Sequence, residues 1–97
     1  MINVLVTLTV KDFTLLAEFE CQAVKVMQSH GGELIRAFES HRSDDGSGEE
    51  IHLLEFPSQA EFDAYRADSV LVEYAELRQK AIVSTAVIIS DKIKEYI

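Results

Sequence analysis

Apolar residues recur with two different periods along this chain, and the change of period predicts its elements. Between positions 2 and 10 apolar side chains occupy every second residue, as in a strand with one buried face. From position 13 the spacing changes to three and four residues, which is typical of an amphipathic helix. The expected strand face comprises Ile2, Val4, Val6, Leu8 and Val10, and the expected helix stripe comprises Phe13, Leu16, Phe19, Ala23, Val24 and Met27.

Short polar signals indicate where the first half of the chain turns. Asp12 or Thr14 can cap the first helix, and Gly31 or Gly32 can end it, because glycine adopts the left-handed backbone that a helix C-terminus often needs. Residues 33–42 then read as a second strand. The polar, glycine-containing stretch 43–48 is typical of a hairpin loop, so we expect the returning strand at 50–56.

The second half repeats the order of helix and strand. Ser58 and Glu61 have the Ser-x-x-Glu spacing of a capping box, which predicts a helix start directly after the third strand. We expect this helix to break near Asp68 and Ser69 and to resume over 70–80. The β-branched run 81–90 predicts the fourth strand. The tail 91–97 is expected to pack on a neighbouring molecule through Ile93, Tyr96 and Ile97.

The resulting order βαββαβ predicts an α+β, ferredoxin-like domain over residues 1–97, with a four-stranded antiparallel sheet and the helices on one face. The fourth strand is apolar on both faces, with Ile82, Ala86 and Ile88 alternating with Val83, Val87 and Ile89. Helices cover one face only, so we expect a second copy to cover the other. The predicted assembly is a homodimer with two facing sheets.

Composition narrows the class of protein. The chain has 97 residues, of which 47% are hydrophobic and 27% charged, as in ordinary soluble domains. A formal net charge of -8 argues against nucleic-acid partners and acidic membrane surfaces, since both are bound by clustered cations. Cys21 is the single cysteine, and neither a signal peptide nor a membrane-spanning run is recognisable. We therefore expect a cytoplasmic protein.

The chain contains the short motifs His30-Gly31-Gly32, Glu55-Phe56-Pro57-Ser58, Tyr65, Asp68 and Leu77-Arg78. Together they resemble a bacterial domain-of-unknown-function family of the dimeric α/β-barrel superfamily, which is related to antibiotic-biosynthesis-monooxygenase-like proteins. A proline and a tyrosine usually follow the aspartate in that family, whereas this chain has Ser69 and Leu71. The resemblance implies a dimeric barrel. The superfamily includes cofactor-independent quinol monooxygenases, muconolactone isomerases and haem-binding peroxidases.

Two charged residues lie in strands that are otherwise apolar. Glu55 is expected to face the cavity on the dimer side together with Ile51 and Leu53, and Arg36 is expected on the same face of the second strand. The two side chains would either orient a polar ligand, with Glu55 as a base, or form a structural ion pair.

The remaining candidates are histidines, aromatic residues and an arginine. His52 is a second candidate base, and His41 and His52 would face each other if the register of the hairpin allows it. No metal-ligand spacing is recognisable, so we expect no metal and no cofactor. Phe38 and Tyr65 are candidate ligand-binding residues, with the core as the alternative. Arg78 is expected either to pair with an acidic group or to reach a ligand carboxylate at the cavity mouth.

Two functions follow as hypotheses. The first is a homodimer that binds a small apolar or aromatic metabolite in a sheet-lined cavity, with cofactor-independent monooxygenation or isomerisation as the reaction that the resemblance implies. The second is a non-catalytic protein that sequesters a ligand or acts as a structural or stress accessory. Whether the protein is an enzyme remains open at this point.

Overall fold

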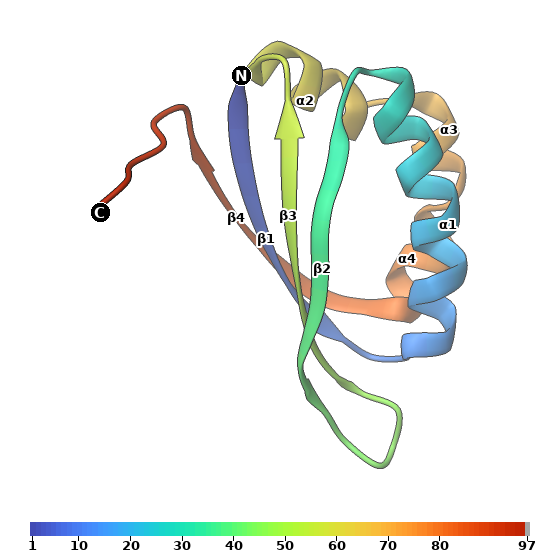
Figure 1. Cartoon of the computed structure of the whole chain (residues 1–97). Helices are drawn as coiled ribbons and strands as arrows, with labels where there is room; N and C mark the ends of the chain where they lie inside the picture. The colour runs from blue at the N-terminus through green and yellow to red at the C-terminus, as the bar shows by residue number, and fades with distance from the viewer. Residues whose placement is uncertain (97) are drawn as a thin grey trace.

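Four strands form one antiparallel sheet in the computed structural model, which describes residues 1–96 (Figure 1). Along the chain the elements are β1 (Ile2–Val10), α1 (Phe13–Ser29), β2 (Glu33–Arg42), β3 (Gly48–Phe56), α2 (Gln59–Arg66), α3 (Ser69–Glu73), α4 (Ala75–Ala81) and β4 (Ile82–Ser90). The strands are ordered β2-β3-β1-β4 across the sheet. All four helices lie on one side of it (Figure 1). The predicted ferredoxin-like fold is confirmed.

The core lies between the sheet and the helices. Directly paired residues share a face, so the register of β1 with β3, in which Val4 lies opposite Leu54 and Ile2 opposite Phe56, places these apolar side chains under the helices. Phe56 and Phe62 are fully buried, with ring centroids 5.2 Å apart. Two buried clusters, one at each end of the sheet, meet at Val6 and Leu71. Burial of this apolar face is the main source of stability.

The stripe of α1 differs from its prediction at one position. Val26 is buried, whereas Val24 is only half-buried. Successive helical residues are rotated by about 100°, which places Val26 nearer the centre of the stripe and Val24 at its edge. The other predicted stripe residues, Phe13, Leu16, Phe19, Ala23 and Met27, are buried.

The face assignment of β4 was wrong at its first residue. Val10 lies opposite Ile82, whereas Thr9 lies opposite Ser84, so Val83 is an extra residue in the ladder. Such a bulge reverses the alternation of faces on one side of it. Ile82 is therefore buried under the helices, on the same face as Val87 and Ile89, rather than beside Ala86 and Ile88.

The helix ends follow the polar signals. Of the two candidates, Asp12 caps α1, because its Oδ1 accepts from the Leu15 N–H at 3.1 Å. Ser58 caps α2 by accepting from the Glu61 N–H at 3.3 Å, and Gly31 takes the left-handed conformation with φ 76°. The predicted helix 70–80 is divided at Tyr74 into α3 and α4.

The other face of the sheet, which we call the open face, has no helix over it (Figure 1). It includes Leu5, Ile51 and Leu53, which are half-buried, and the more exposed Phe38 and Ile88. None of the helices in the described part of the chain is long and apolar enough to span a membrane.

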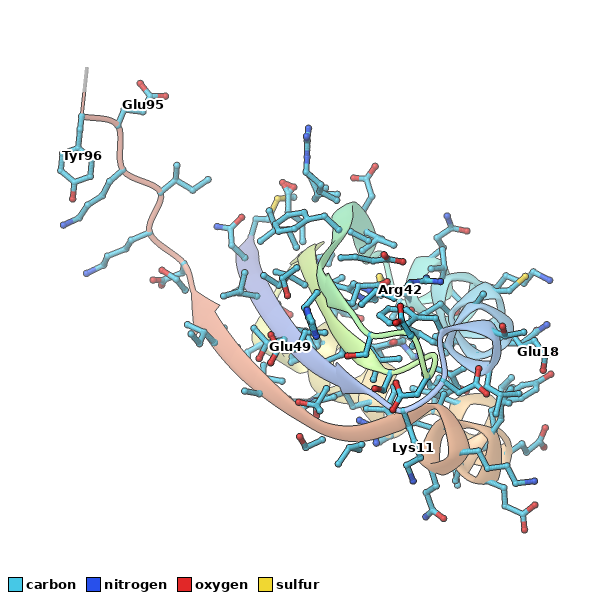
Figure 2. The ribbon with its side chains drawn as sticks, turned by 90° about the horizontal axis from the view of Figure 1, so that it is seen from below. Lys11, Glu18, Arg42, Glu49, Glu95 and Tyr96 are labelled. Atoms are coloured by element: carbon cyan, nitrogen blue, oxygen red, sulfur yellow. The ribbon has the colours of Figure 1, made fainter. Side chains whose placement is uncertain are left out.

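The C-terminal tail leaves the sheet after β4 and extends away from the body of the molecule (Figure 2). Ile93 and Tyr96 are 78% and 89% exposed. Ile97, the third residue of the predicted contact, lies outside the described residues. Contact of the tail with a neighbouring molecule stays a prediction.

Candidate functional site

A cavity of about 390 Å³ lies between the sheet and the helices. Its walls are mostly apolar, with Leu8 and Leu54 from the sheet and Phe19, Phe62 and Leu71 from the helices. A concave, largely apolar space with a few polar groups is the usual form of a small-molecule site. The cavity lies on the helix side of the sheet, whereas the sequence placed the site on the open face.

Five ionisable side chains from four different elements line this cavity. They are Glu20 of α1, His52 of β3, Tyr65 and Arg66 of α2, and Arg78 of α4. These elements are separated in the chain, so the crossover connections bring them together. The cavity thus combines apolar walls with a small set of polar groups.

His52 is held by a neighbour on its own strand. Its Nε2 lies 2.5 Å from Oε2 of Glu50, and only 6% of the His52 side chain is exposed. The two residues are two positions apart in β3, so they share a face of the sheet. When Nε2–H donates to the carboxylate, the neutral ring has its lone pair on Nδ1. This is how a carboxylate orients a histidine base.

Glu20 is a largely buried carboxyl that has neither a hydrogen bond nor an ion pair through its side chain within residues 1–96. Burial raises the pKa of Glu20, because an apolar environment disfavours the charged form. The charges of His52 and Arg78 act in the opposite direction, and that of Glu50 adds to the increase. The balance favours the protonated acid compared with an exposed glutamate.

Tyr65 combines a packed ring with a hydroxyl that has no hydrogen-bond partner in the described chain. Its ring centroid lies 5.5 Å from that of Phe56 and 6.3 Å from that of Phe62. Burial raises the pKa of Tyr65, and the nearby Glu20 raises it further. The hydroxyl therefore stays protonated and can act as a donor.

Arg78 has no acidic partner within residues 1–96, so the expected ion pair is absent from the described chain. Its Nη2 donates to Oγ1 of Thr85 at 3.4 Å, which is long for a hydrogen bond. Most of its donors are thus free to meet a ligand, which was the other expectation for this arginine.

The other three predicted site residues lie on the open face. Glu55 is opposite Glu33 and Asn3 in the sheet, and Arg36 is opposite Leu53. No ion pair joins Arg36 to Glu55 in the described part of the chain, so the expected structural pair is not formed there. Phe38 is opposite Ile51 and 44% exposed. The structure therefore separates these residues from His52, Tyr65 and Arg78.

The histidines do not form a cluster. His41 lies opposite Glu49 on the open face, whereas His52 lies opposite Ala37 under the helices, so the two rings are on different sides of the sheet. The bulges in β2 decide this register. Among residues 1–96 no group of three or more His, Cys, Asp or Glu side chains is placed to hold a metal ion.

Sequence reasoning missed Glu20 and Glu50, although each has a visible signal. Glu20 follows Leu16 by four residues and precedes Ala23 by three, which places its carboxyl on the apolar stripe of α1. Glu50 has the same parity as His52 and Leu54, so it shares their buried face. A charge that interrupts a buried periodic face is the signal for this site.

Comparison with known proteins places the chain in a fold and a family. A family model described as a domain of unknown function (DUF1330) matches residues 3–92. A protein from Agrobacterium tumefaciens matches with TM-score 0.72 and 20% identity over 97% of this chain and 95% of its own. A protein of unknown function from Rhodopseudomonas palustris matches with TM-score 0.75 and 17% identity over 97% and 84%.

A third solved structure has a stated activity. SnoaB, a cofactor-independent oxygenase from Streptomyces nogalater, matches with TM-score 0.70 and 8% identity over 97% of this chain and 94% of its own. Such low identities show a shared fold alone. No curated protein sequence matches the chain.

Proposed function

This chain belongs to the DUF1330 family of domains of unknown function, and we propose that it binds a small, mainly apolar or aromatic metabolite in the helix-side cavity. The observation that supports this most is the convergence of Glu20, His52, Tyr65 and Arg78 in an apolar space of about 390 Å³. Glu20 and Tyr65 make no side-chain hydrogen bond within residues 1–96, yet no side-chain N or O atom there is both fully buried and unpaired. Their polar atoms therefore remain accessible from the cavity, where a ligand or water can bond them.

The chemistry available in the cavity is proton transfer. Glu50 orients the His52 ring through Nε2, so Nδ1 can take a proton from a ligand hydroxyl or an acidic carbon. Proton removal is a step that cofactor-free oxygenation and isomerisation share. The likeness in fold to a cofactor-independent oxygenase agrees with this chemistry and carries no more weight than a shared fold.

We also propose that two copies associate through their open faces. Apolar side chains such as Leu53, Phe38 and Ile88 lie there without cover from any described element. In that assembly Glu55 and Arg36 would lie between the two sheets. They are the alternative polar groups for a ligand bound on this side.

Binding of 1-naphthol, an aromatic alcohol, tests which side of the sheet holds the site. We expect backbone amide shifts around the cavity in NMR titrations of the wild-type protein. His52→Ala should weaken binding about tenfold, because it removes the one acceptor that Glu50 orients. Glu55→Gln is the matched control on the opposite face of the same strand, and it should bind as the wild type does.

Two other outcomes have a definite meaning. If Glu55→Gln weakens binding and His52→Ala does not, the site lies on the open face and the helix-side proposal is wrong. If 1-naphthol binds in the cavity but no oxygen is consumed and no product forms over a panel of aromatic alcohols, ligand sequestration without turnover is the supported function.

A further inference from the structure

We infer that the ligand of the helix-side cavity bears a carboxylate on its apolar or aromatic body, with Arg78 as the residue that binds the carboxylate. This inference rests on the proposed function, because it names the ligand class of the same cavity. It is carried by the distribution of charge around the cavity and by the donors that the protein leaves unused.

Two arginines line the cavity, and Arg78 is the one without an acidic partner within residues 1–96. Arg66 also lines the cavity, but its Nη2 lies 2.9 Å from Oδ1 of Asp63 and its guanidinium lies 4.3 Å from the centroid of the Phe62 ring. Within residues 1–96 the one hydrogen bond of the Arg78 side chain is the 3.4 Å contact with Thr85. A guanidinium group binds a carboxylate through two parallel hydrogen bonds, which no described acidic residue supplies here.

The acidic groups of the cavity do not oppose this. Glu20 is the carboxyl that lines the cavity, and its burial favours the protonated form. Glu50 is not among the lining residues and is already bonded to His52. A protonated Glu20 donates a hydrogen bond, so it would bind a ligand carboxylate rather than repel it.

Tyr65 adds another donor beside the same groups. Tyr65, Glu20 and Arg78 all line the same cavity. A guanidinium, a carboxyl whose pKa is raised and a phenol hydroxyl therefore line one cavity whose walls are otherwise mostly apolar. This combination suits a single anionic head group on an apolar body better than a neutral or cationic one.

The test compares 1-naphthoate with its neutral counterpart 1-naphthamide by isothermal titration calorimetry. The wild-type protein should bind the carboxylate at least about tenfold more tightly, as expected for a charge-assisted pair. Arg78→Met should abolish this preference while affinity for the amide stays within about twofold. Lys80→Met, which removes the same charge from the same helix, is the control and should keep the preference.

The pH dependence separates the role of Glu20 from that of Arg78. Affinity for 1-naphthoate should fall as pH rises through the raised pKa of Glu20, above the ordinary glutamate range, because an ionised Glu20 repels the ligand carboxylate. Of the groups around Glu20, His52 and Arg78 lower its pKa, Glu50 raises it, and Tyr65 stays neutral. Glu20→Gln keeps a donor without the charge, so it should remove most of this pH dependence.

Equal affinity for the two compounds in the wild-type protein would overturn the inference. So would an Arg78→Met variant that loses the amide as strongly as the carboxylate. If 1-naphthol binds in the cavity and 1-naphthoate does not, the ligand class is wrong and the proposed function stands. If neither compound gives shifts around the cavity, the proposed function is overturned as well.

Discussion

Glu20 is a charged residue type in a position that the fold otherwise fills with apolar side chains. Its carboxyl lies on the apolar stripe of α1 and has no partner among the described side chains. Natural proteins tolerate such a group mainly at sites of function, where a shifted pKa is useful. The cost should be measurable as stability.

We predict that Glu20→Gln unfolds less readily than the wild type at pH 8. The native state raises the pKa of Glu20, so it binds this proton more tightly than the unfolded chain, and the free energy of unfolding falls as pH rises through the window above the ordinary glutamate value. The free energy of unfolding of Glu20→Gln should exceed that of the wild type by about 0.5–1 kcal/mol at pH 8. The difference should be close to zero at pH 4, where the side chain at position 20 is neutral in both proteins.

Urea unfolding at the two pH values measures this difference. Glu18→Gln is the control, because Glu18 is exposed on the same helix and points away from the body (Figure 2). An equal gain at both pH values would contradict an effect of Glu20 ionisation.

Gly32 is packed so closely that no space is left for a side chain. A Cβ atom there would lie 2.4 Å from Cε1 of Phe56 and 2.8 Å from Cγ of Met27. Both neighbours belong to the buried core. We predict that Gly32→Ala lowers the free energy of unfolding by about 1–3 kcal/mol, as overpacking does.

Gly46→Ala provides the comparison, measured by the same denaturant titration. Nothing lies within 4 Å of a Cβ at Gly46, so only its φ of 88° is unfavourable for alanine. Its loss should be smaller, about 1 kcal/mol. A larger loss at Gly46 than at Gly32 would mean that the Phe56 ring yields to the extra methyl group.

At the scale of elements, α3 is held by few contacts. It has no buried residue, and Leu71 is its half-buried side chain. Asp68 precedes it and accepts two hydrogen bonds, one at Oδ1 from the Val70 N–H at 2.8 Å and one at Oδ2 from Nε2 of His30 at 2.7 Å. The second bond ties α3 to the end of α1. His30, at the C-terminal end of α1, therefore has a specific partner.

We predict that His30→Ala speeds amide hydrogen exchange at Val72 and Tyr74, because α3 loses its tie to α1. The hydrogen bond from His30 lowers the pKa of Asp68, so the contribution of the tie is present above the ordinary aspartate value and is lost as pH falls through the lowered pKa. Asp63→Asn breaks an exposed pair in α2 instead and should leave exchange in α3 unchanged. Equal protection in His30→Ala would show that Leu71 alone holds α3.

At the scale of the whole molecule, the sheet is covered on one face only. Leu5, Ile51 and Leu53 form the half-buried centre of the open face. An apolar sheet face without cover is an expected site of association. This is the surface through which we propose the homodimer.

We predict a dimer at micromolar concentration by light scattering, and a monomer for Leu53→Glu. A glutamate there would place two like charges in the interface, which costs several kcal/mol. Val70→Glu is the control, since Val70 is 46% exposed on α3, away from the open face. A wild-type protein that stays monomeric would remove the basis for the proposed association.

The sequence by itself determined the elements, because their signals are local. Periods of two and of three to four residues mark strands and helices, Asp12 and Ser58 mark two helix starts, and Gly31 marks a helix end. With four strands and antiparallel connections, this order restricts the topology to the ferredoxin-like sheet. Three residues of the candidate site, His52, Tyr65 and Arg78, were also identified from sequence.

Only the tertiary structure decided which of these residues act together. The bulge at Val83 places Ile82 under the helices, and the hairpin register sends His41 and His52 to opposite faces. Glu20, His52 and Arg78 meet because three distant segments pack over one face of the sheet. Register and packing depend on partners far apart in the chain, so no local period contains them.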